Sequence, residues 1–355
     1  MKKALIAMSG GVDSSVAAYL IKEKGFECIG ATMRLHCKES EDASCLTSKD
    51  IEDARKIASS LDMPYEVYDF QDNFREKVID KFVNTYKTGG TPNPCIDCNR
   101  HLKFAALMNK MAELSCDYVV TGHYARVAFD EKSGRYLLKK GLDESKDQSY
   151  VLYSLTQEQL SHILLPLGEY TKEETRQIAE KLDLELSQKK DSQDICFVPD
   201  GDYAKFIEEY TGEKFSEGDF VDLNGNKLGT HKGIIRYTIG QRKGLGLALP
   251  ASMYVTKTSV EENKVYLGFN EDLFSKELEA TDINLIFADE IKEPIKCTAK
   301  IRYKHKEAPC TVWQTEKDRI HIEFDEPQRA ITKGQAVVLY DGDTVLGGGT
   351  IEKCL

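Results

Sequence analysis

The sequence contains no long apolar segment. No run approaches the roughly eighteen consecutive apolar residues of a membrane-spanning helix, although 41% of the 355 residues are hydrophobic. The opening stretch, MKKALIAM, lacks the apolar core and the small-residue cleavage site of a secretory signal peptide. We therefore expect a cytoplasmic protein with no membrane partner.

Positive charge is also scarce. The chain carries 48 lysine and arginine residues against 59 aspartate and glutamate residues, a net charge of −11. This balance excludes general affinity for polyanions, so a nucleic-acid partner requires local basic patches. The ten cysteines are scattered along the chain. In a reducing cytosol we expect most of them, such as Cys28 and Cys297, to be buried apolar residues rather than disulfides.

The first third of the sequence alternates short apolar runs with helical patterns. Strands are predicted over 3–8, 27–33, 65–69 and 118–121, and helices over 12–24, 51–61, 72–88 and 99–114. This order is typical of an α/β fold with a doubly wound parallel sheet and ligands at the carboxyl ends of its strands. The polar segment 34–49, which contains Cys37 and Cys45, is predicted to be a loop over that edge.

The rest of the chain changes in character. A hairpin is predicted over 126–138, with its turn at Lys132-Ser133-Gly134, and helices over 156–164 and 172–182. From about residue 219 glycine becomes frequent and short β-like runs follow one another. We predict three domains: a nucleotide-binding domain over 1–205, a small β-rich central domain over 206–278, and a C-terminal β-barrel over 279–355.

The loop after the first predicted strand, Ser9-Gly10-Gly11-Val12-Asp13-Ser14, is the most specific motif. It lacks the lysine of a G-x-x-x-x-G-K-[ST] loop and the pattern G-x-G-x-x-G. Its glycines expose backbone N–H groups at a helix start, where they and the hydroxyls of Ser9, Ser14 and Ser15 match phosphate oxygens. Asp13 beside phosphates is a candidate Mg²⁺ ligand, and the alternative is a helix N-cap on an ordinary turn.

This loop resembles the pyrophosphatase loop of the ATP pyrophosphatase (PP-loop) superfamily. The resemblance implies activation of a carbonyl or carboxylate oxygen with AMP and release of pyrophosphate. The loop alone leaves open asparagine, GMP and NAD synthetases, lysidine synthase and the tRNA thiolation enzymes. An amidotransferase-type member needs an ammonia source such as a glutaminase with an N-terminal cysteine, which we do not expect here, since Met1-Lys2 opens onto the first strand.

A second motif, TPNPCIDCNRHLKF, spans 91–104. Its prolines fix an extended approach to a C-x-x-C pair. A closed zinc site needs a second Cys/His pair, which no neighbouring segment supplies at suitable spacing. Cys98 precedes the predicted helix, whose dipole we expect to lower the thiol pKa. Nearby positive charge from Arg100, His101 and Lys103 should act in the same direction. The stretch therefore predicts a rigid loop that presents a reactive thiol.

Five ordered motifs resemble the bacterial tRNA-specific 2-thiouridylase family. They are TPNPCIDCNRHLKF, TGHYARV at 121–127, ESKDQSYVL at 144–152, DSQDICFVPDGDY at 191–203 and TIGQRKGLG at 238–246. The resemblance extends to KGQAVVLYDGDTVLGGGTI near the C-terminus. It implies an adenine nucleotide alpha hydrolase-like N-terminal domain and a barrel that grips tRNA. The implied reaction replaces the C2 oxygen of the wobble uridine with sulfur, giving 2-thiouridine, AMP and pyrophosphate.

The same resemblance implies roles for individual residues. Cys98 matches the nucleophile and Cys196 the cysteine that carries a persulfide, supplied by a sulfur-relay protein or cysteine desulfurase. ATP and Mg²⁺ are the implied cofactors, and the matching ATP positions are Ala7, Met8, Ser9, Gly10, Gly11, Val12, Asp13, Ser14, Met33 and Gly122. Positions that match contacts with the anticodon stem-loop of tRNA are Asn93, Pro94, Cys95, His123, Lys146, Asp147, Gln148, Arg302, Tyr303 and Gln335.

Cys95 departs from the family pattern, which has an aspartate at that position. An ordinary thiol is mostly protonated at neutral pH, which argues against an acid/base role for Cys95. Cys95, Cys98 and Cys196 are also candidate ligands of a [4Fe–4S] cluster with one open iron. An iron–sulfur-dependent version of the thiolation is therefore an alternative to the persulfide mechanism.

Two basic segments are candidate tRNA contacts. The segment 227–243 contains no acidic residue and five basic ones: Lys227, Lys232, Arg236, Arg242 and Lys243. If 299–305 is a strand, four basic side chains project to one face: Lys300, Arg302, Lys304 and Lys306. The alternative for each segment is a merely solvated surface. The alternative for the whole chain is a nucleotide-sensing RNA-binding protein without catalysis.

Overall fold

The computed structural model describes residues 1–35, 48–182, 195–249 and 251–355. The chain divides into two compact units, each assembled from separate segments. The first comprises Met1–Ile79, Pro94–Pro199 and Asp341–Gly347, and the second comprises Asp80–Asn93, Asp200–Tyr340 and Gly348–Leu355. The three continuous domains predicted from the sequence stay a prediction. Cys37, Cys45 and most of the predicted loop 34–49 lie outside the described residues, as do the first four residues of the motif at 191–203.

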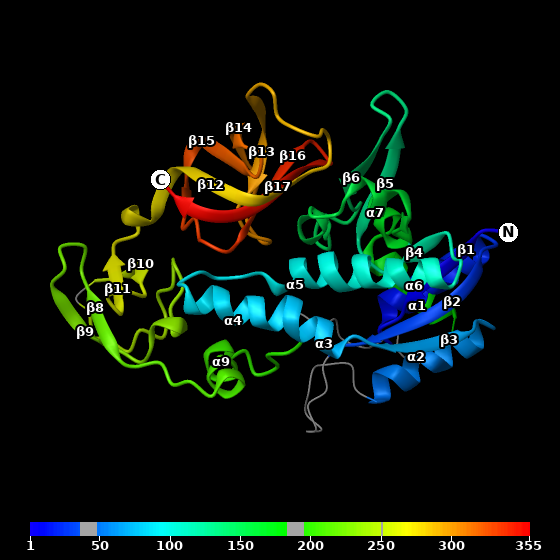
Figure 1. The fold of residues 1–355 in the computed structure, drawn as a ribbon, viewed down its shortest axis with the longest axis horizontal. Helices are drawn as coiled ribbons and strands as arrows, with labels where there is room; N and C mark the ends of the chain where they lie inside the picture. The colour runs from blue at the N-terminus through cyan, green and yellow to red at the C-terminus, as the bar shows by residue number, and fades with distance from the viewer. Residues whose placement is uncertain (36–47, 183–194, 250) are drawn as a thin grey trace. The chain divides into compact units, whose positions relative to one another are not determined.

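A five-stranded parallel sheet forms the centre of the first unit (Figure 1). Its order is β3-β2-β1-β4-β7, with β1 at Lys3–Ala7, β2 at Glu27–Arg34, β3 at Tyr65–Asp69, β4 at Tyr118–Val120 and β7 at Ile163–Leu164. The strand order reverses direction between β1 and β4, which is the arrangement of a doubly wound sheet. The predicted α/β fold is therefore confirmed. The predicted helix 156–164 is too long, because α7 ends at Ser161 and the chain then enters β7.

Helices bury one face of this sheet. Ala4 and Ile6 of β1, and Met8 directly after it, alternate along the chain and so share a face, which packs in one buried cluster with residues of α1, α2 and α8. The helical segments of this unit are α1 Val12–Glu23, α2 Ser48–Ser60, α3 Gln71–Phe74, η1 Arg75–Ile79, α5 Pro94–Asp97, η2 Cys98–Ala106, α6 Leu107–Glu113, η3 Ser149–Leu152, α7 Gln157–Ser161, η4 Pro166–Glu169 and α8 Lys172–Lys181. Among the helices within the described residues, none combines the length and apolar character needed to cross a bilayer.

The predicted hairpin is confirmed as β5, Ala125–Asp130, and β6, Arg135–Lys140. Gly134 has a φ of +67° at its turn, a conformation that glycine adopts without steric cost. β6 also pairs with Thr344 and Val345. The guanidinium of Arg126 donates to Asp343 at 2.9 Å, which ties this C-terminal segment to the first unit.

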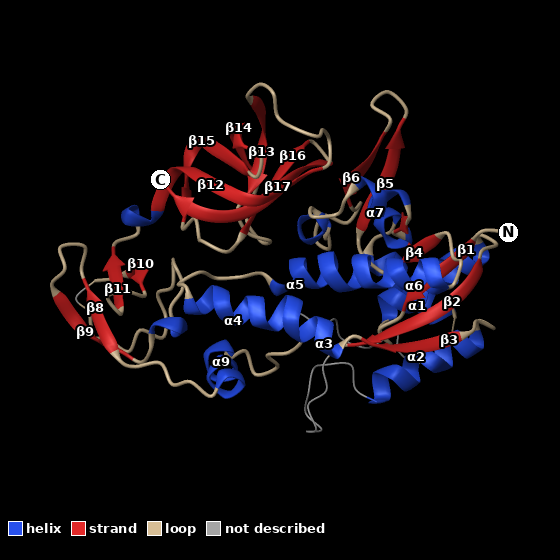
Figure 2. Cartoon of the chain, viewed as in Figure 1, coloured by secondary structure: helices blue, strands red, loops and turns tan. Residues whose placement is uncertain are grey.

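The second unit is rich in strands (Figure 2). Its helical segments are α4 Asp80–Lys87, α9 Tyr203–Thr211, η5 Ile234–Arg236 and η6 Glu271–Leu273. A four-stranded sheet has the order β10-β11-β8-β9, with β8 Gly218–Val221, β9 Lys227–His231, β10 Tyr254–Ser259 and β11 Lys264–Gly268. The predicted central β-rich region is confirmed.

The C-terminal strands form a closed barrel, as predicted. They run in the order β12-β15-β14-β13-β16-β17, and β12 also pairs with β17, so the sheet closes on itself. Ile320, Ile322 and Phe324 alternate along β15 and are buried in its interior. The strands are β12 Phe274–Leu285, β13 Ile295–Lys300, β14 Ala308–Glu316, β15 Arg319–Arg329, β16 Ala336–Asp341 and β17 Thr344–Cys354.

The strand predicted over 299–305 is wrong. β13 ends at Lys300, and the chain then turns, with the backbone N–H of His305 donating to the carbonyl of Arg302 at 3.1 Å. The predicted row of basic side chains on one strand face is therefore absent from this described segment. Arg302 instead donates to the carbonyl of Ala330 and to the hydroxyl of Thr332.

Candidate active site

The loop between β1 and α1 is shaped by its own hydroxyl groups. Ser14 and Ser15 both donate to the carbonyl of Gly11, at 3.0 and 2.9 Å, and the backbone N–H of Ser9 donates to the Ser14 hydroxyl at 3.2 Å. Ser15 is fully buried. Both hydroxyls therefore brace the loop in this structure, and the expectation that Ser14 and Ser15 donate to phosphate oxygens stays a prediction.

Backbone groups at the start of α1 remain the main phosphate-binding feature. Gly10 has a φ of +68°, and a Cβ there would lie 2.3 Å from the carbonyl oxygen of Asp50, so only glycine fits. Gly11 is the N-cap of α1, and no side chain caps the helix there. A helix start of this kind combines unsatisfied N–H groups with the positive end of the helix dipole, which suits an anion.

Gly122, at the end of β4, packs directly on this loop. A Cβ at Gly122 would lie 2.8 Å from the carbonyl carbon of Asp13 and 2.9 Å from the backbone nitrogen of Ser14. Met33 lies in β2 near its carboxyl end and is buried. Gly122 and Met33, two of the predicted ATP positions, therefore lie at the carboxyl edge of the sheet.

Asp13 has two partners that the sequence did not indicate. The ammonium group of Lys172 lies 2.8 and 2.9 Å from its two carboxylate oxygens, and the hydroxyl of Tyr124 donates to Oδ1 at 2.8 Å. The side chain of Lys172 is 9% exposed and that of Asp13 is 33% exposed. Such a long-range ion pair leaves no signal in local sequence, because 159 positions separate its members.

The donor set at Asp13 suits Mg²⁺ only together with a nucleotide. Among the described residues, no three His, Cys, Asp or Glu side chains are grouped so as to hold a metal ion. Mg²⁺ is commonly bound by one or two carboxylates and by substrate phosphates. Asp13 is the only acidic residue of the loop, so it would be the protein ligand.

Cys98 lies within a helix rather than before one. The helix begins at Pro94, a residue suited to a first helical position, and Asp97 already has helical dihedral angles before η2 continues the same run. Although the residue is only half-buried, protein atoms surround its thiol, and the loss of hydration raises the thiol pKa to about 12. Lys103 opposes this shift without reversing it. The predicted low pKa of Cys98 is therefore wrong in this structure.

Cys196 lies in the same unit as Cys98 and the loop. It is exposed, while its neighbour Phe197 is buried and packs edge-to-face on Phe74 with ring centroids 5.7 Å apart. The thiols of Cys196 and Cys95 are close enough to Cys98 to raise its pKa further. The fold thus places three thiols that span about a hundred positions of sequence within electrostatic range of one another, although among the described residues they do not form a group that could hold a metal ion.

His123 is buried rather than surface-exposed. Its Nδ1 lies 2.7 Å from the hydroxyl of Thr121, and its ring centroid lies 5.7 Å from that of Phe104. Burial, assisted by the positive charge of Lys103, lowers its pKa well below the usual value near 6.5. The ring is therefore neutral at physiological pH, and its predicted contact with tRNA stays a prediction.

Several of the residues predicted to contact tRNA make hydrogen bonds within the protein itself. Asp147 accepts the backbone N–H groups of Gly141 and Ser149, both at 3.1 Å, and Gln148 accepts that of Tyr124 at 3.0 Å. Their side chains fix the segment that also carries Lys146. In the second unit, the side-chain amide of Gln335 donates to the carbonyl of Thr91 at 2.8 Å. Thr91 lies two residues before Asn93 in the sequence.

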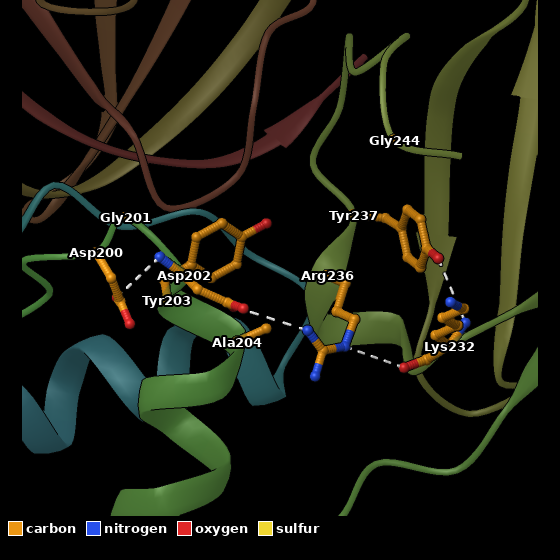
Figure 3. A pocket seen from close by; sticks show the side chains of 9 residues that line it. All are labelled: Asp200, Gly201, Asp202, Tyr203, Ala204, Lys232, Arg236, Tyr237 and Gly244. Atoms are coloured by element: carbon orange, nitrogen blue, oxygen red, sulfur yellow. Dashed lines mark hydrogen bonds and ion pairs between the residues drawn. The ribbon is translucent and has the colours of Figure 1, made fainter. Parts of the chain in front are cut away.

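The predicted basic patch over 227–243 is partly neutralised. Lys227 pairs with Asp219 at 2.6 Å, and Arg236 pairs with Glu208 at 2.8 Å. Figure 3 shows Arg236 in a cavity of about 390 Å³. Acidic, basic and aromatic side chains line this cavity together: Asp200, Asp202, Tyr203, Lys232, Arg236 and Tyr237. This part of the segment is not the purely cationic surface that the sequence predicted, and the cavity includes neither the thiols nor the phosphate loop.

Comparison with known proteins covers the whole chain. Family models match a tRNA methyl transferase HUP domain over residues 2–200, a tRNA methyl transferase PRC-barrel domain over 204–269 and an aminomethyltransferase beta-barrel domain over 275–351. The tRNA-specific 2-thiouridylase MnmA of Clostridioides difficile is 52% identical, with 100% of this chain and 99% of that protein covered. That of Lachnoclostridium phytofermentans is 50% identical, with 99% and 100% covered.

The chain belongs to the tRNA-specific 2-thiouridylase family. The domain descriptions mention methyl transfer, but the relatives that match over the full length, at about half identity, are named 2-thiouridylases. The full-length match therefore determines the family. A solved structure of the U34-tRNA thiolase NcsA of Methanococcus maripaludis with its [4Fe–4S] cluster is 20% identical, with a TM-score of 0.35 over 59% of this chain and 66% of that one. That likeness is too low to bear on the cofactors of this 2-thiouridylase. The relatives at about half identity are named 2-thiouridylases, and on that ground the iron–sulfur alternative is not favoured.

We predict that the reactivity of Cys98 rises with pH in the folded protein. Below a pKa of about 12 the thiolate fraction grows about tenfold per pH unit, so alkylation by iodoacetamide should follow that slope between about pH 7 and pH 9.5. Mass spectrometry of the peptide that contains Cys98 measures the rate. In the urea-unfolded protein the rate should level off near pH 9. A plateau near pH 8 in the folded protein would contradict the raised pKa.

A second prediction concerns His123 and stability in acid. Because the folded-state pKa is depressed, the unfolded chain takes up a proton below about pH 6.5 that the folded protein does not. The free energy of unfolding should therefore fall by about 1.4 kcal/mol per pH unit below that pH on account of this residue. Measured by urea unfolding, the free energy of unfolding of His123→Gln should fall with decreasing pH less steeply than that of wild type, by that amount per pH unit. Replacement of the exposed His162 serves as the control. Equal slopes for wild type and His123→Gln would refute the assignment.

Proposed function

We propose that this chain catalyses ATP-dependent 2-thiolation of the wobble uridine of tRNA, with Cys196 as the sulfur carrier and Cys98 as the resolving nucleophile. The observation that supports this proposal most strongly is that the two thiols lie within electrostatic range of each other, in the unit that also holds the phosphate loop. A sulfur-transfer enzyme needs both an activated base and a sulfur nucleophile at one place.

The first step activates the base. The C2 oxygen of uridine attacks the α-phosphorus of ATP, the bond to the β-phosphate oxygen breaks, and pyrophosphate leaves. The backbone N–H groups at the start of α1 stabilise charge on the transferring phosphate. Bound Mg²⁺ would neutralise phosphate charge beside Asp13.

The second step transfers sulfur. The terminal sulfur of a Cys196 persulfide attacks C2, and AMP leaves with the former C2 oxygen. The thiolate of Cys98 then attacks the Sγ of Cys196. The bond between Sγ and the transferred sulfur breaks, and the electron pair leaves with the thiolated base. The sulfane sulfur is reduced while the two cysteines are oxidised to a disulfide, so electrons balance. Loading the persulfide requires a sulfur-relay protein or a cysteine desulfurase, which belongs to the same proposal.

The raised pKa of Cys98 fits a nucleophile that acts late in this order. A thiol with a pKa of about 12 is protonated at neutral pH and so does not attack the persulfide prematurely. A change in hydration or in nearby charge at the site is then required to release its proton. Lys103, which favours the thiolate, is the neighbouring group that acts in this direction.

Substitution of the thiols provides the test. Cys98→Ser and Cys196→Ser should each lower tRNA 2-thiolation to below about 1% of wild type, because serine can neither carry nor reduce sulfane sulfur. Both variants should bind Mg·ATP as wild type does. Retardation of thiolated tRNA in a mercury-containing gel measures the product, and Cys354→Ser, at an exposed cysteine, is the matched control.

Normal thiolation by either active-site variant would overturn the mechanism. The rival function, a nucleotide-sensing RNA-binding protein without catalysis, predicts no thiolated product from the wild-type protein either, even with persulfide, ATP and tRNA supplied.

A further inference from the structure

We propose that Cys297 and Cys310 form a site of reversible oxidation, at which a disulfide links β13 to β14 in the C-terminal barrel and restricts the turn between these strands. Their sulfur atoms lie 3.7 Å apart as free thiols. Both residues lie in the second unit, whereas Cys98, Cys196 and the phosphate loop lie in the first. The oxidation therefore needs no part of the proposed thiolation reaction.

The register of the barrel brings the two thiols together. Cys297 and Cys310 are direct partners in the antiparallel pairing of β13 with β14, so their side chains lie on the same face of the sheet. Residues directly opposite each other on antiparallel strands have Cα atoms about 4.5–5.5 Å apart, within the range of about 4.4–6.8 Å found across disulfides. A bond between the two sulfur atoms therefore requires rotation of side chains rather than movement of the strands.

The two cysteines differ in access, which sets the order of reaction. Cys297 is half-buried, whereas Cys310 is 2% exposed. The hydrogen bond between the two thiols, together with burial, raises the pKa of Cys310. Cys297 is therefore the thiol that a small oxidant reaches first, and Cys310 is the second.

The oxidant is a low-molecular-weight disulfide, of which glutathione disulfide is the probe. The Cys297 thiolate attacks one of its sulfur atoms, the bond between the two small-molecule sulfurs breaks, and one small thiolate leaves. The sulfur of Cys310 then loses its proton and attacks the Sγ of Cys297, and the second small thiolate leaves. The two cysteines lose two electrons, which the small disulfide gains, and the two released protons go to the small thiolates. Excess small thiol reverses both steps.

The disulfide would lie close to an exposed turn. Only two cross-strand pairs separate the thiols from the turn at 301–307. That turn carries Arg302 and Tyr303, two residues predicted to contact tRNA, and two exposed lysines, Lys304 and Lys306. A covalent link so near the base of the turn restricts its local opening.

Redox equilibration of the full-length protein tests for the disulfide. Wild-type protein, folded or unfolded in urea, is incubated in mixtures of reduced and oxidised glutathione, and the exchange is quenched with acid. Mass spectrometry then measures the link between the tryptic peptides 297–300 and 307–317. Because the fold holds the two sulfur atoms together, the equilibrium constant for the disulfide should be at least about tenfold higher in the folded protein than in urea.

Cys28 and Cys116 provide a matched control within the same chain. Both are buried free cysteines, but Cys28 lies in β2 and Cys116 lies two residues before β4, and these strands flank β1. Strands on opposite sides of a third are roughly 9–10 Å apart, too far for a disulfide. This pair should therefore form none in the folded protein. Cys297→Ser should abolish the barrel disulfide and leave Cys310 as a thiol.

Brief treatment of the folded protein with trypsin tests the effect on the turn. Cleavage after Lys304 and Lys306 should be about threefold or more slower in the oxidised than in the reduced protein, because the protease needs the turn to open locally. Cleavage after the exposed Lys132, in the hairpin of the first unit, should proceed equally in both forms. In Cys297→Ser the redox state should have no effect on either cleavage.

Two results would overturn the proposal: an equilibrium constant no higher in the folded protein than in urea, or equal cleavage of the turn in the oxidised and reduced proteins. Neither measurement involves ATP or tRNA, so a failure of the proposed function would leave both results unchanged.

Discussion

The close packing of β4 on the loop after β1 is the contact on which the site depends. At Gly122 the two backbones approach so closely that a Cβ would lie less than 3.0 Å from Asp13 and Ser14. This approach follows from the parallel pairing of β4 with β1, because parallel neighbours end at the same edge of a sheet. It also places the residues that follow Gly122 beside the loop: the hydroxyl of Tyr124 reaches Asp13, and His123 is buried next to Phe104. A substitution at Gly122 would therefore disturb the phosphate loop and the buried surroundings of His123 together.

The thiol pair depends on a different kind of contact. Cys98 is carried by a helix that begins at Pro94, whereas Cys196 lies in a turn fastened by its buried neighbour Phe197. The edge-to-face contact of Phe197 with Phe74 holds that turn against the helices of the first unit. One cysteine is thus half-buried and the other exposed. This division matches the proposed chemistry, in which Cys196 must be reached by a sulfur donor and Cys98 must be protected until the persulfide has reacted.

Local patterns in the sequence predicted most of the fold. The apolar runs of β1 to β4, the Ser-Gly-Gly turn into α1 and the Gly134 hairpin all express local preferences, and each lies where it was predicted. The errors arose where tertiary context decides. Nothing local indicates that Lys172 neutralises Asp13, that Asp147 accepts backbone N–H groups, or that burial outweighs the charge of Lys103 at Cys98. The run after Lys300 alternates like a strand but turns, since Arg302 finds carbonyl and hydroxyl partners across the barrel end.

The central claim is that the terminal sulfur of a Cys196 persulfide passes to the base while Cys98 forms a disulfide with the Sγ of Cys196. A single turnover tests it most directly: persulfide-loaded protein is mixed with Mg·ATP and tRNA without reductant, and the peptides and nucleosides are then quantified by mass spectrometry. The account predicts one Cys98–Cys196 disulfide for each 2-thiouridine formed. Formation of 2-thiouridine with both cysteines left as free thiols would contradict it.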